Sequence, residues 1–330
     1  MPTRTRFALV LTACLAVLQV GVAQVTQAQT EQRAWPQRTV RFIIPFGPGA
    51  AADVAARILA ERLQKVWDKP IVVENRPGGD GLVSLGVFVS AKDDHVLFVS
   101  PTSIFVVHPY TQDNLPYDVD RDLQPIAWIG NTLIGIAVTA KLQVGTLQDF
   151  VDYAKREAGK VNYGISPGFT EFIFDGFMRE HGLSMAKVPF RDILQAPIDL
   201  GEGRIQILMT SFAAQRPQIE SGKTRLLAIG EPKRSALAPG VPTVHEAGYP
   251  GLEATPINAM FGPRDMALEL RRRVGADVVA ALKDKDVVDR LRASGQQETG
   301  AGPDELAAAV AAQHAQVARI AKVLGVSKKK

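Results

Sequence analysis

Hydrophobic and polar positions along the chain follow two alternating patterns. Short, nearly continuous apolar runs are typical of buried strands, whereas longer stretches with an apolar residue every three or four positions are typical of helices. The apolar positions from Val54 to Val66, for example, recur at roughly helical spacing. The first part of the pattern predicts strands at 39–46, 70–76 and 95–103 and helices at 53–67 and 82–91.

The same alternation resumes near Ala127, and Thr146 is placed to cap the first helix of this second part. Strands alternating with helices indicate an α/β protein with largely parallel sheets. The predicted strands lie at 127–140, 160–165, 186–190 and 204–212, and the helices at 146–159, 170–182 and 305–325.

The first 28 residues differ from the rest of the chain. Arg4 and Arg6 precede an apolar run at 7–18, and a polar stretch ends in small residues at Ala28. This is the pattern of a secretory signal peptide, and its apolar part is short for a membrane span. We therefore expect residues 1–28 to direct the protein to the periplasm, with Ala23 as an alternative cleavage site.

The single cysteine, Cys14, lies inside that apolar run. The letters "LTAC" that end at Cys14 resemble the site where bacterial lipoproteins are cut and acylated, so a lipid anchor is the alternative. The mature chain would then begin with "CLAVLQVGV", which is unusually apolar for a flexible start. Without that anchor the mature chain has no cysteine, and neither disulfides nor thiol chemistry is expected.

Length and composition support a globular protein large enough for two cores, with 330 residues of which 46% are hydrophobic and 22% charged. The formal net charge is +4, but two positive charges lie in the first 28 residues and three in a terminal lysine run at 328–330. The remaining body is close to neutral. A nucleic-acid partner is therefore not expected.

Two glycine-rich bends, "FGPGAAAD" at 46–53 and "RPGGDG" at 76–81, each follow a predicted strand and precede a predicted helix. Such a bend leaves backbone N–H groups unpaired at the positive end of a helix dipole, which favours an anion. Bends after neighbouring parallel strands open on one edge of the sheet, where α/β proteins bind ligands. The plainer alternative is turn chemistry, with Asp53 as an ordinary acid of the first helical turn. Nucleotide-binding motifs are missing from both bends.

The letters "GISPG" at 164–168 match the nucleophile elbow of serine hydrolases and lie between a predicted strand and helix. His181, His245 and His314 follow as possible bases. An oxyanion hole needs the N–H of the residue after the nucleophile, however, and Pro167 has none. A secreted hydrolase using Ser166 is thus the disfavoured alternative, and we expect no enzyme activity.

Metal and cofactor sites are not expected. Residues 118–122, "DVDRD", have the opening spacing of a calcium loop, but Leu123 and Ile129 occupy positions that need glycine and glutamate. The interpretation is a solvated turn. The only crowding around a histidine is His95 beside Asp93 and Asp94, which is too few ligands for a metal.

From about Trp35 to Val326 the chain resembles the substrate-binding receptors of tripartite tricarboxylate transporters, often called Bug receptors. Several motifs in the same order carry this resemblance: "WPQRTVRFIIPFGPGAAADVAARIL", "PIVVENRPGGDG", "LPYDVDRDLQPIAWIG", "GKVNYG", "SGKTRLLAI" and "VPTVHEAGYPG".

The resemblance implies a two-lobed clam-shell protein of the periplasmic-binding-protein fold. One lobe is expected from residues 29–130 and 252–330, and the other from residues 131–251. Family members capture small organic anions, commonly carboxylates, and deliver them to membrane transporter subunits, while some serve sensors instead. We expect a monomer that binds its ligand without catalysing a reaction. The sequence leaves the identity of this ligand open.

In the family, the two bends hold a carboxylate through backbone N–H groups and ordered water. The resemblance adds the loop after the third strand and, in the other lobe, the loop at 166–170 with Phe190, where tyrosine is usual. For the side chains the alternatives are a packed aromatic ring or a capping hydroxyl. The candidate ligand-binding residues are Phe46, Gly47, Gly49, Ala50, Ala51, Asp53, Gly78, Gly79, Asp80, Gly81, Ser100, Ser103, Ser166, Phe169, Thr170 and Phe190.

Departures from the family pattern concern the ligand more than the fold. Ala50 and Ala51 stand where paired glycines are usual, and their methyl groups narrow access to the backbone. Asp80 stands where a small residue is usual; it would repel a carboxylate unless it turns away, or attract the ammonium group of an amino acid. Glu171 lies near a common histidine position, and Ile257 near a common tryptophan position.

Overall fold

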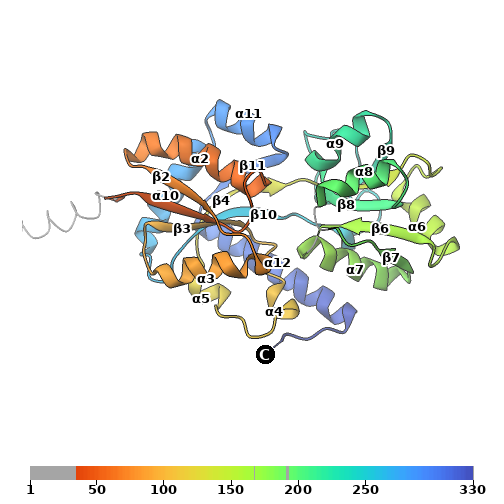
Figure 1. The fold of residues 1–330 in the computed structure, drawn as a ribbon, viewed down its shortest axis with the longest axis horizontal. Helices are drawn as coiled ribbons and strands as arrows, with labels where there is room; N and C mark the ends of the chain where they lie inside the picture. Colours follow the sequence, from red (N-terminus) through yellow and green to blue (C-terminus); the bar gives the residue numbers. More distant parts are fainter. Residues whose placement is uncertain (1–34, 167, 191–192, 330) are drawn as a thin grey trace, which may run out of the picture.

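The computed structural model describes residues 35–166, 168–190 and 193–329, which form two α/β lobes side by side (Figure 1). The first lobe contains a six-stranded sheet in the order β11-β4-β10-β3-β1-β2. Its strands are β1 Val40–Ile44, β2 Ile71–Asn75, β3 Val96–Pro101, β4 Gln124–Thr132, β10 Ile257–Gly262 and β11 Gln296–Ala301. Its helices are α2 Ala51–Trp67, α3 Leu82–Ala91, α4 His108–Thr111, α5 Val119–Asp122, α10 Leu268–Ala281, α11 Lys285–Ala293 and α12 Pro303–Leu324, with the short 3₁₀ helix η1 Gly79–Gly81.

The second lobe contains a five-stranded sheet in the order β7-β6-β8-β5-β9. The chain leaves the first sheet after β4, forms this sheet, and returns to the first sheet at β10. The strands are β5 Ile134–Thr139, β6 Val161–Ile165, β7 Met185–Lys187, β8 Ile207–Ser211 and β9 Thr224–Ile229. The helices are α6 Leu147–Arg156, α7 Phe169–His181, α8 Ala196–Gly201 and α9 Phe212–Glu220, with the 3₁₀ helices η2 Ile193–Gln195 and η3 Pro250–Leu252.

Strand direction differs from the prediction of largely parallel sheets, because both sheets are mixed. β1 pairs in parallel with β2 and β3, but β10 is antiparallel to β3 and β4, and β11 is antiparallel to β4. In the second sheet β5 is antiparallel to both β8 and β9. The reason in the first sheet is that β10 enters from the second lobe and therefore runs away from it, whereas β1 to β4 run toward it.

The apolar stretch at 127–140, predicted as one run of strand residues, is divided between the two sheets. β4 ends at Thr132 and β5 begins at Ile134. Leu133 between them is fully buried, so the hydrophobic pattern continues without a break while the chain passes from one lobe to the other. The predicted cap of α6 is confirmed, because the Thr146 side chain accepts from the Asp149 N–H at 3.1 Å.

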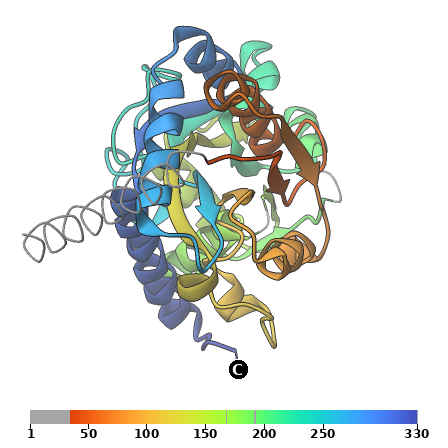
Figure 2. The same cartoon turned by 90° about the vertical axis from the view of Figure 1, so that its left-hand side faces the viewer.

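Helices lie on both sides of the first sheet (Figure 2), and each face of the sheet has its own hydrophobic core. Alternate residues of β1 divide between them: Phe42 and Ile44 pack under α2, α10 and α11, while Ile43 packs with residues of α3 and α12. The core that includes Ile43 continues into the second lobe, where α12 packs against α7. Within the described ranges, the helices lack the combination of length and apolar character needed to cross a membrane.

Candidate functional site

Three loops of the first lobe meet at the edge of the sheet that faces the second lobe. They follow β1, β2 and β3, which are parallel and therefore end on the same side. Gly81, in the second bend, has φ +90°, and a Cβ placed on it would lie 2.7 Å from Ile104 Cγ2 and 3.6 Å from Pro45 Cβ. Because Pro45 precedes the first bend and Ile104 belongs to the loop after β3, these contacts bring all three loops together.

The first bend exposes the start of α2 without a side-chain cap. Ala50 is the N-cap residue and makes no capping hydrogen bond, and the first helical bond runs from the Val54 N–H to the Ala50 carbonyl at 2.9 Å. The N–H groups of Ala51, Ala52 and Asp53 precede that bond and lie at the positive end of the helix dipole. A Cβ placed on Gly47 or Gly49 would meet open space. The bend is therefore an open backbone site with the electrostatic sign that suits an anion.

Asp53 lies behind this bend, and its carboxylate is only 2% exposed. Oδ2 accepts from the Gly49 N–H at 2.9 Å, and Oδ1 accepts from Asn75 Nδ2 at 2.8 Å and from Arg57 Nε at 3.0 Å. Burial raises the pKa of Asp53, but the hydrogen bonds from Arg57, Gly49 and Asn75 outweigh burial and hold the pKa below its usual range. This ionised side chain holds the backbone, and its oxygens are occupied by protein donors.

The second bend is a tight turn with an unusual backbone. Gly78 has φ +129°, and the Gly81 N–H donates to the Gly78 carbonyl at 3.0 Å. Asp80 has φ +50°, a left-handed conformation that is uncommon for a residue with a side chain. Its Oδ2 accepts from Gln112 Nε2 at 3.2 Å. Gln112 thus orients the Asp80 carboxylate, and the bend itself is formed by the backbone.

Sequence reasoning missed His108 and Tyr117, which support the second bend from α4 and the loop before α5. His108 Nε2 lies 3.1 Å from the Asp80 carbonyl oxygen, and His108 Nδ1 lies 2.5 Å from the Tyr117 hydroxyl. Burial lowers the pKa of His108, and the bond to Asp80 only partly offsets it. Burial also raises the pKa of Tyr117. An isolated histidine after an apolar run, "IFVVH" at 104–108, is the weak signal that was available.

The loop of the second lobe approaches the first lobe at Gly168 and Ser103. A Cβ placed on Gly168 would lie 3.6 Å from the Ser103 carbonyl oxygen. Gly168 is the N-cap of α7 and makes no side-chain cap, so a second uncapped helix start lies near the loops of the first lobe. The Thr170 hydroxyl donates to the Ser166 carbonyl at 3.0 Å. Candidate residues of both lobes therefore come together here.

Other predicted side chains point into the protein. Phe169 is 1% exposed and belongs to the main core, and Ser100 is fully buried with its hydroxyl donating to the Pro101 carbonyl at 2.9 Å. Phe190 is half-buried and packs beside Ile193 and Ala196. Phe46, in contrast, is 36% exposed at the first bend.

The hydrolase alternative gains nothing from the surroundings of Ser166. Its hydroxyl lies 2.6 Å from the Thr210 hydroxyl. Among the described residues, His181 packs on Phe177 and Tyr249, and His245 lies 2.6 Å from Glu253. Pro167, on which the sequence argument against a hydrolase rests, lies outside the described residues.

The two acidic stretches are held by neighbouring cations and backbone groups. Where a solvated turn is predicted, Val119–Asp122 form the short helix α5 with Asp122 buried, and Asp118 caps it by accepting from the Arg121 N–H at 2.9 Å. Asp93 pairs with Arg38 at 2.7 Å, and His95 Nδ1 lies 2.6 Å from Asp94. The carboxylates and imidazole at 93–95 are close enough to one another to hold a metal ion, but each of them has a protein partner.

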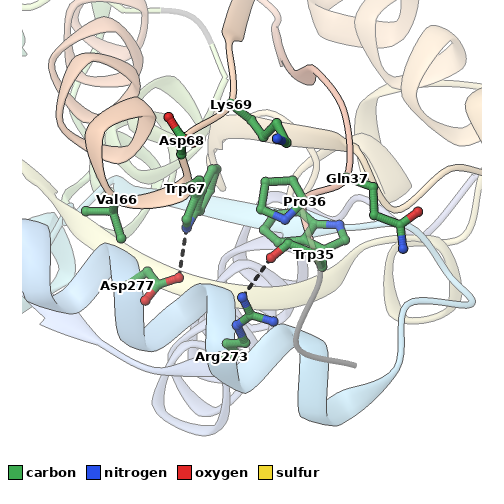
Figure 3. Close-up of a pocket in the computed structure, with 9 residues that line it drawn as sticks. All are labelled: Trp35, Pro36, Gln37, Val66, Trp67, Asp68, Lys69, Arg273 and Asp277. Carbon is green, nitrogen blue, oxygen red and sulfur yellow. Dashed lines mark hydrogen bonds between the residues drawn. The ribbon is translucent and has the colours of Figure 1, made fainter. Parts of the chain in front are cut away.

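An open pocket of about 570 Å³ lies at the opposite end of β1 from the bends (Figure 3). Its wall combines the segment before β1 with the end of α2 and part of α10. Trp67 Nε1 donates to Asp277 at 2.8 Å, and Arg273 donates to the Trp35 carbonyl at 2.7 Å. The polar groups in these two bonds are thus paired with other lining residues. The pocket shares no residue with the bends.

A two-lobed α/β structure with loops gathered at the lobe interface defines the class of periplasmic solute-binding proteins. The chain has this fold: a periplasmic transporter of known structure superposes with a TM-score of 0.77 at 28% identity, covering 89% of this chain and 99% of that one. R. palustris Rpa4515, solved with adipate, superposes with a TM-score of 0.76 at 26% identity, covering 89% and 99%.

The model of the tripartite tricarboxylate transporter family receptor matches residues 55–326, and the chain belongs to this family. The chain is also 29% identical to protein BugT of Bordetella pertussis over 300 residues, which cover 89% of this chain and 92% of BugT. The resemblance seen in the sequence is thus confirmed.

Proposed function

We propose that this protein is a periplasmic receptor that captures a small organic carboxylate between its lobes and delivers it to the membrane subunits of a tripartite tricarboxylate transporter. In this proposal residues 1–28 direct export, residues 29–130 and 252–330 form the first lobe, and residues 131–251 form the second. The receptor acts as a monomer and catalyses no reaction. A receptor that reports its ligand to a sensor is the alternative.

The uncapped start of α2 carries this proposal. It offers N–H groups and a positive dipole end to an anion, while Asp53, the carboxylate in the first turn of the helix, is occupied by Gly49, Asn75 and Arg57. The second bend and Ser103 complete the first-lobe side, and Ser166, Thr170 and Phe190 supply the second-lobe side. Support for a carboxylate comes from the adipate bound by the R. palustris relative.

A thermal-shift and calorimetry screen of the purified protein tests the proposal with adipate, other mono-, di- and tricarboxylates, amino acids, aromatic acids and neutral sugars. A ligand at 100 times its dissociation constant adds about 2.7 kcal/mol of stability, which raises the melting temperature measurably. Stabilisation by a carboxylate class, with none from sugars or salt, supports the proposal. No stabilisation of a refolded, ligand-free sample by any carboxylate contradicts it.

A matched pair of variants at Gly47 tests the place of binding. A side chain at Gly47 meets open space, and its φ lies outside the left-handed region, so Gly47→Asp and Gly47→Asn are expected to fold alike. The added negative charge should weaken carboxylate binding by about ten- to a hundredfold relative to the asparagine variant. Equal affinities of the two variants would place the carboxylate elsewhere.

The transporter partner is tested by uptake in cells. Loss of this protein should abolish transport of the bound carboxylate. If uptake continues unchanged while the transcriptional response to the ligand disappears, the sensor alternative replaces the transporter.

A further inference from the structure

The second bend is supported from inside the first lobe by two buried side chains, His108 and Tyr117. They are 2% and 6% exposed. The pair forms a chain of contacts from the Tyr117 hydroxyl through both nitrogens of His108 to the carbonyl of Asp80. It therefore ends on the backbone of the bend, at the peptide group whose N–H, that of Gly81, closes the turn on the Gly78 carbonyl.

The direction of each hydrogen bond follows from the acceptor at the end of the chain. The Asp80 carbonyl oxygen can only accept, so Nε2 of His108 must carry the hydrogen. In the neutral imidazole Nδ1 is then the acceptor, and the Tyr117 hydroxyl donates to it. The Asp80 carbonyl thereby selects the neutral tautomer of His108, and the Tyr117 hydroxyl, which can donate or accept, completes the chain by donating to Nδ1.

Holding Asp80 matters because its backbone, with φ +50° and ψ 37°, is in the left-handed region. This region is less favourable than the right-handed one for residues with a side chain, although aspartate enters it more readily than most. The bond from His108 fixes its carbonyl, and Gln112 Nε2 fixes its carboxylate at 3.2 Å. Rotation of this residue would disturb the turn that the Gly81 N–H closes on the Gly78 carbonyl.

We propose that His108, in the Nε2–H tautomer that the Asp80 carbonyl requires and that the Tyr117 hydroxyl supports, is a positioning residue that holds the second bend in its ligand-binding conformation. This inference rests on the proposed function, in which the bend contacts the carboxylate. His108 acts through the Asp80 backbone and does not touch the ligand.

Three variants and a control test the positioning role in the ligand-free protein. Tyr117→Phe removes the hydrogen bond to Nδ1, His108→Leu removes the bond to Asp80, and His108→Gln keeps an amide donor near the position of Nε2. Val106→Ala is the control, because Val106 is a fully buried neighbour in the same core that has no polar side chain.

Hydrogen exchange and histidine NMR are the readouts. We expect His108 of the wild type to show the Nε2–H tautomer, and Tyr117→Phe to keep this tautomer while the nitrogen chemical shift of Nδ1 reports the loss of its hydrogen bond. Protection of the hydrogen-bonded amides at 81–83 should fall about tenfold in His108→Leu, less in Tyr117→Phe, and least in His108→Gln. The hydrogen-bonded amides of Gly49 and Ala50 should keep their protection in all three, and Val106→Ala should not single out the second bend.

An Nδ1–H tautomer in the wild type, or equal loss of protection at both bends, would overturn the positioning role. With adipate as the probe, affinity should fall in the order of the exchange effects, and unchanged affinity would overturn the link to binding. Failure of the wild type to bind any carboxylate counts against the proposed function. The ligand-free measurements separate that failure from a failure of the positioning role.

Discussion

In the first bend a buried ionised carboxylate, Asp53, holds the backbone through the Gly49 N–H, whereas in the second a buried imidazole, His108, holds the backbone through the Asp80 carbonyl. The first support pairs with a cation, Arg57, at 2.9 Å, and the second pairs with a neutral phenol. Both bends present backbone N–H groups at the same edge of the sheet. The comparison shows that similar backbone sites can be held either by an ionised side chain or by a neutral one. The two supports should therefore respond differently to mutation and to pH.

The largest expected effect follows from removing the charged support. Asp53→Ala deletes acceptors of a backbone N–H, an amide and a guanidinium, and should cost about 3 kcal/mol of unfolding free energy. The isosteric Asp53→Asn keeps part of the bonding and should cost about half as much. Urea denaturation gives these values, and calorimetry should show weaker carboxylate binding in both variants. Full affinity in Asp53→Ala would mean that the first bend needs no support.

The two supports also differ in how well the sequence predicts them. The residues that hold the first bend lie within one strand–bend–helix unit and the next strand, where local patterns identify strand, turn and helix start. The predicted strands at 39–46, 70–76 and 95–103 accordingly contain β1, β2 and β3. The sequence also places Asp53 in the first helical turn, but it does not predict the bonds of Asp53 to Gly49 and Asn75.

The support of the second bend depends on contacts that no local pattern encodes. His108 is 28 positions from Asp80, and neither residue lies in a periodic stretch that orients it toward the other. The same limit explains the mixed sheets, because the antiparallel insertion of β10 between β3 and β4 depends on a chain that returns from the second lobe. Burial of Phe169 and Ser100 also depends on packing between distant elements.

Replacing one glycine of each bend by alanine should reduce the free energy of unfolding by different amounts. Gly81→Ala combines φ +90° with a Cβ only 2.7 Å from Ile104 Cγ2, and should cost about 2–3 kcal/mol. Gly49→Ala has φ +87° but open space, and should cost only about 1–2 kcal/mol. Thermal or urea unfolding measures both.

Truncation of Ile104 provides the control for this pair. Ile104→Ala should recover part of the loss in Gly81→Ala, because the close contact disappears, and none of the loss in Gly49→Ala. Equal costs for the two glycine variants, with no recovery, would show that the loops do not pack as tightly at the second bend as the Ile104 contact indicates.

The smallest effect is a difference in pH dependence. The pKa of His108 in the folded protein lies below its ordinary value of 6.5, chiefly because of burial. The contribution of His108 to stability is therefore complete above pH 6.5 and declines as the pH falls from 6.5 toward the pKa of the folded state. The pKa of Asp53 lies below 3.8, because its hydrogen bonds outweigh burial, so its contribution declines only below that pH. Between these values, acid should loosen the second bend alone.

Amide protection factors, corrected for intrinsic exchange, measure this difference between pH 7.5 and 4.5. The charged or titratable groups facing His108 are Asp80 and Tyr117, and the charge of Asp80 moderates the effect because it favours the imidazolium. We expect a decline of protection at 81–83 that is absent at Gly49 and Ala50 and absent from both bends in His108→Gln, which cannot titrate. A parallel decline of protection at both bends would mean that acid loosens the whole lobe. The ionisation states of Asp53 and His108 would then not determine how firmly each bend is held.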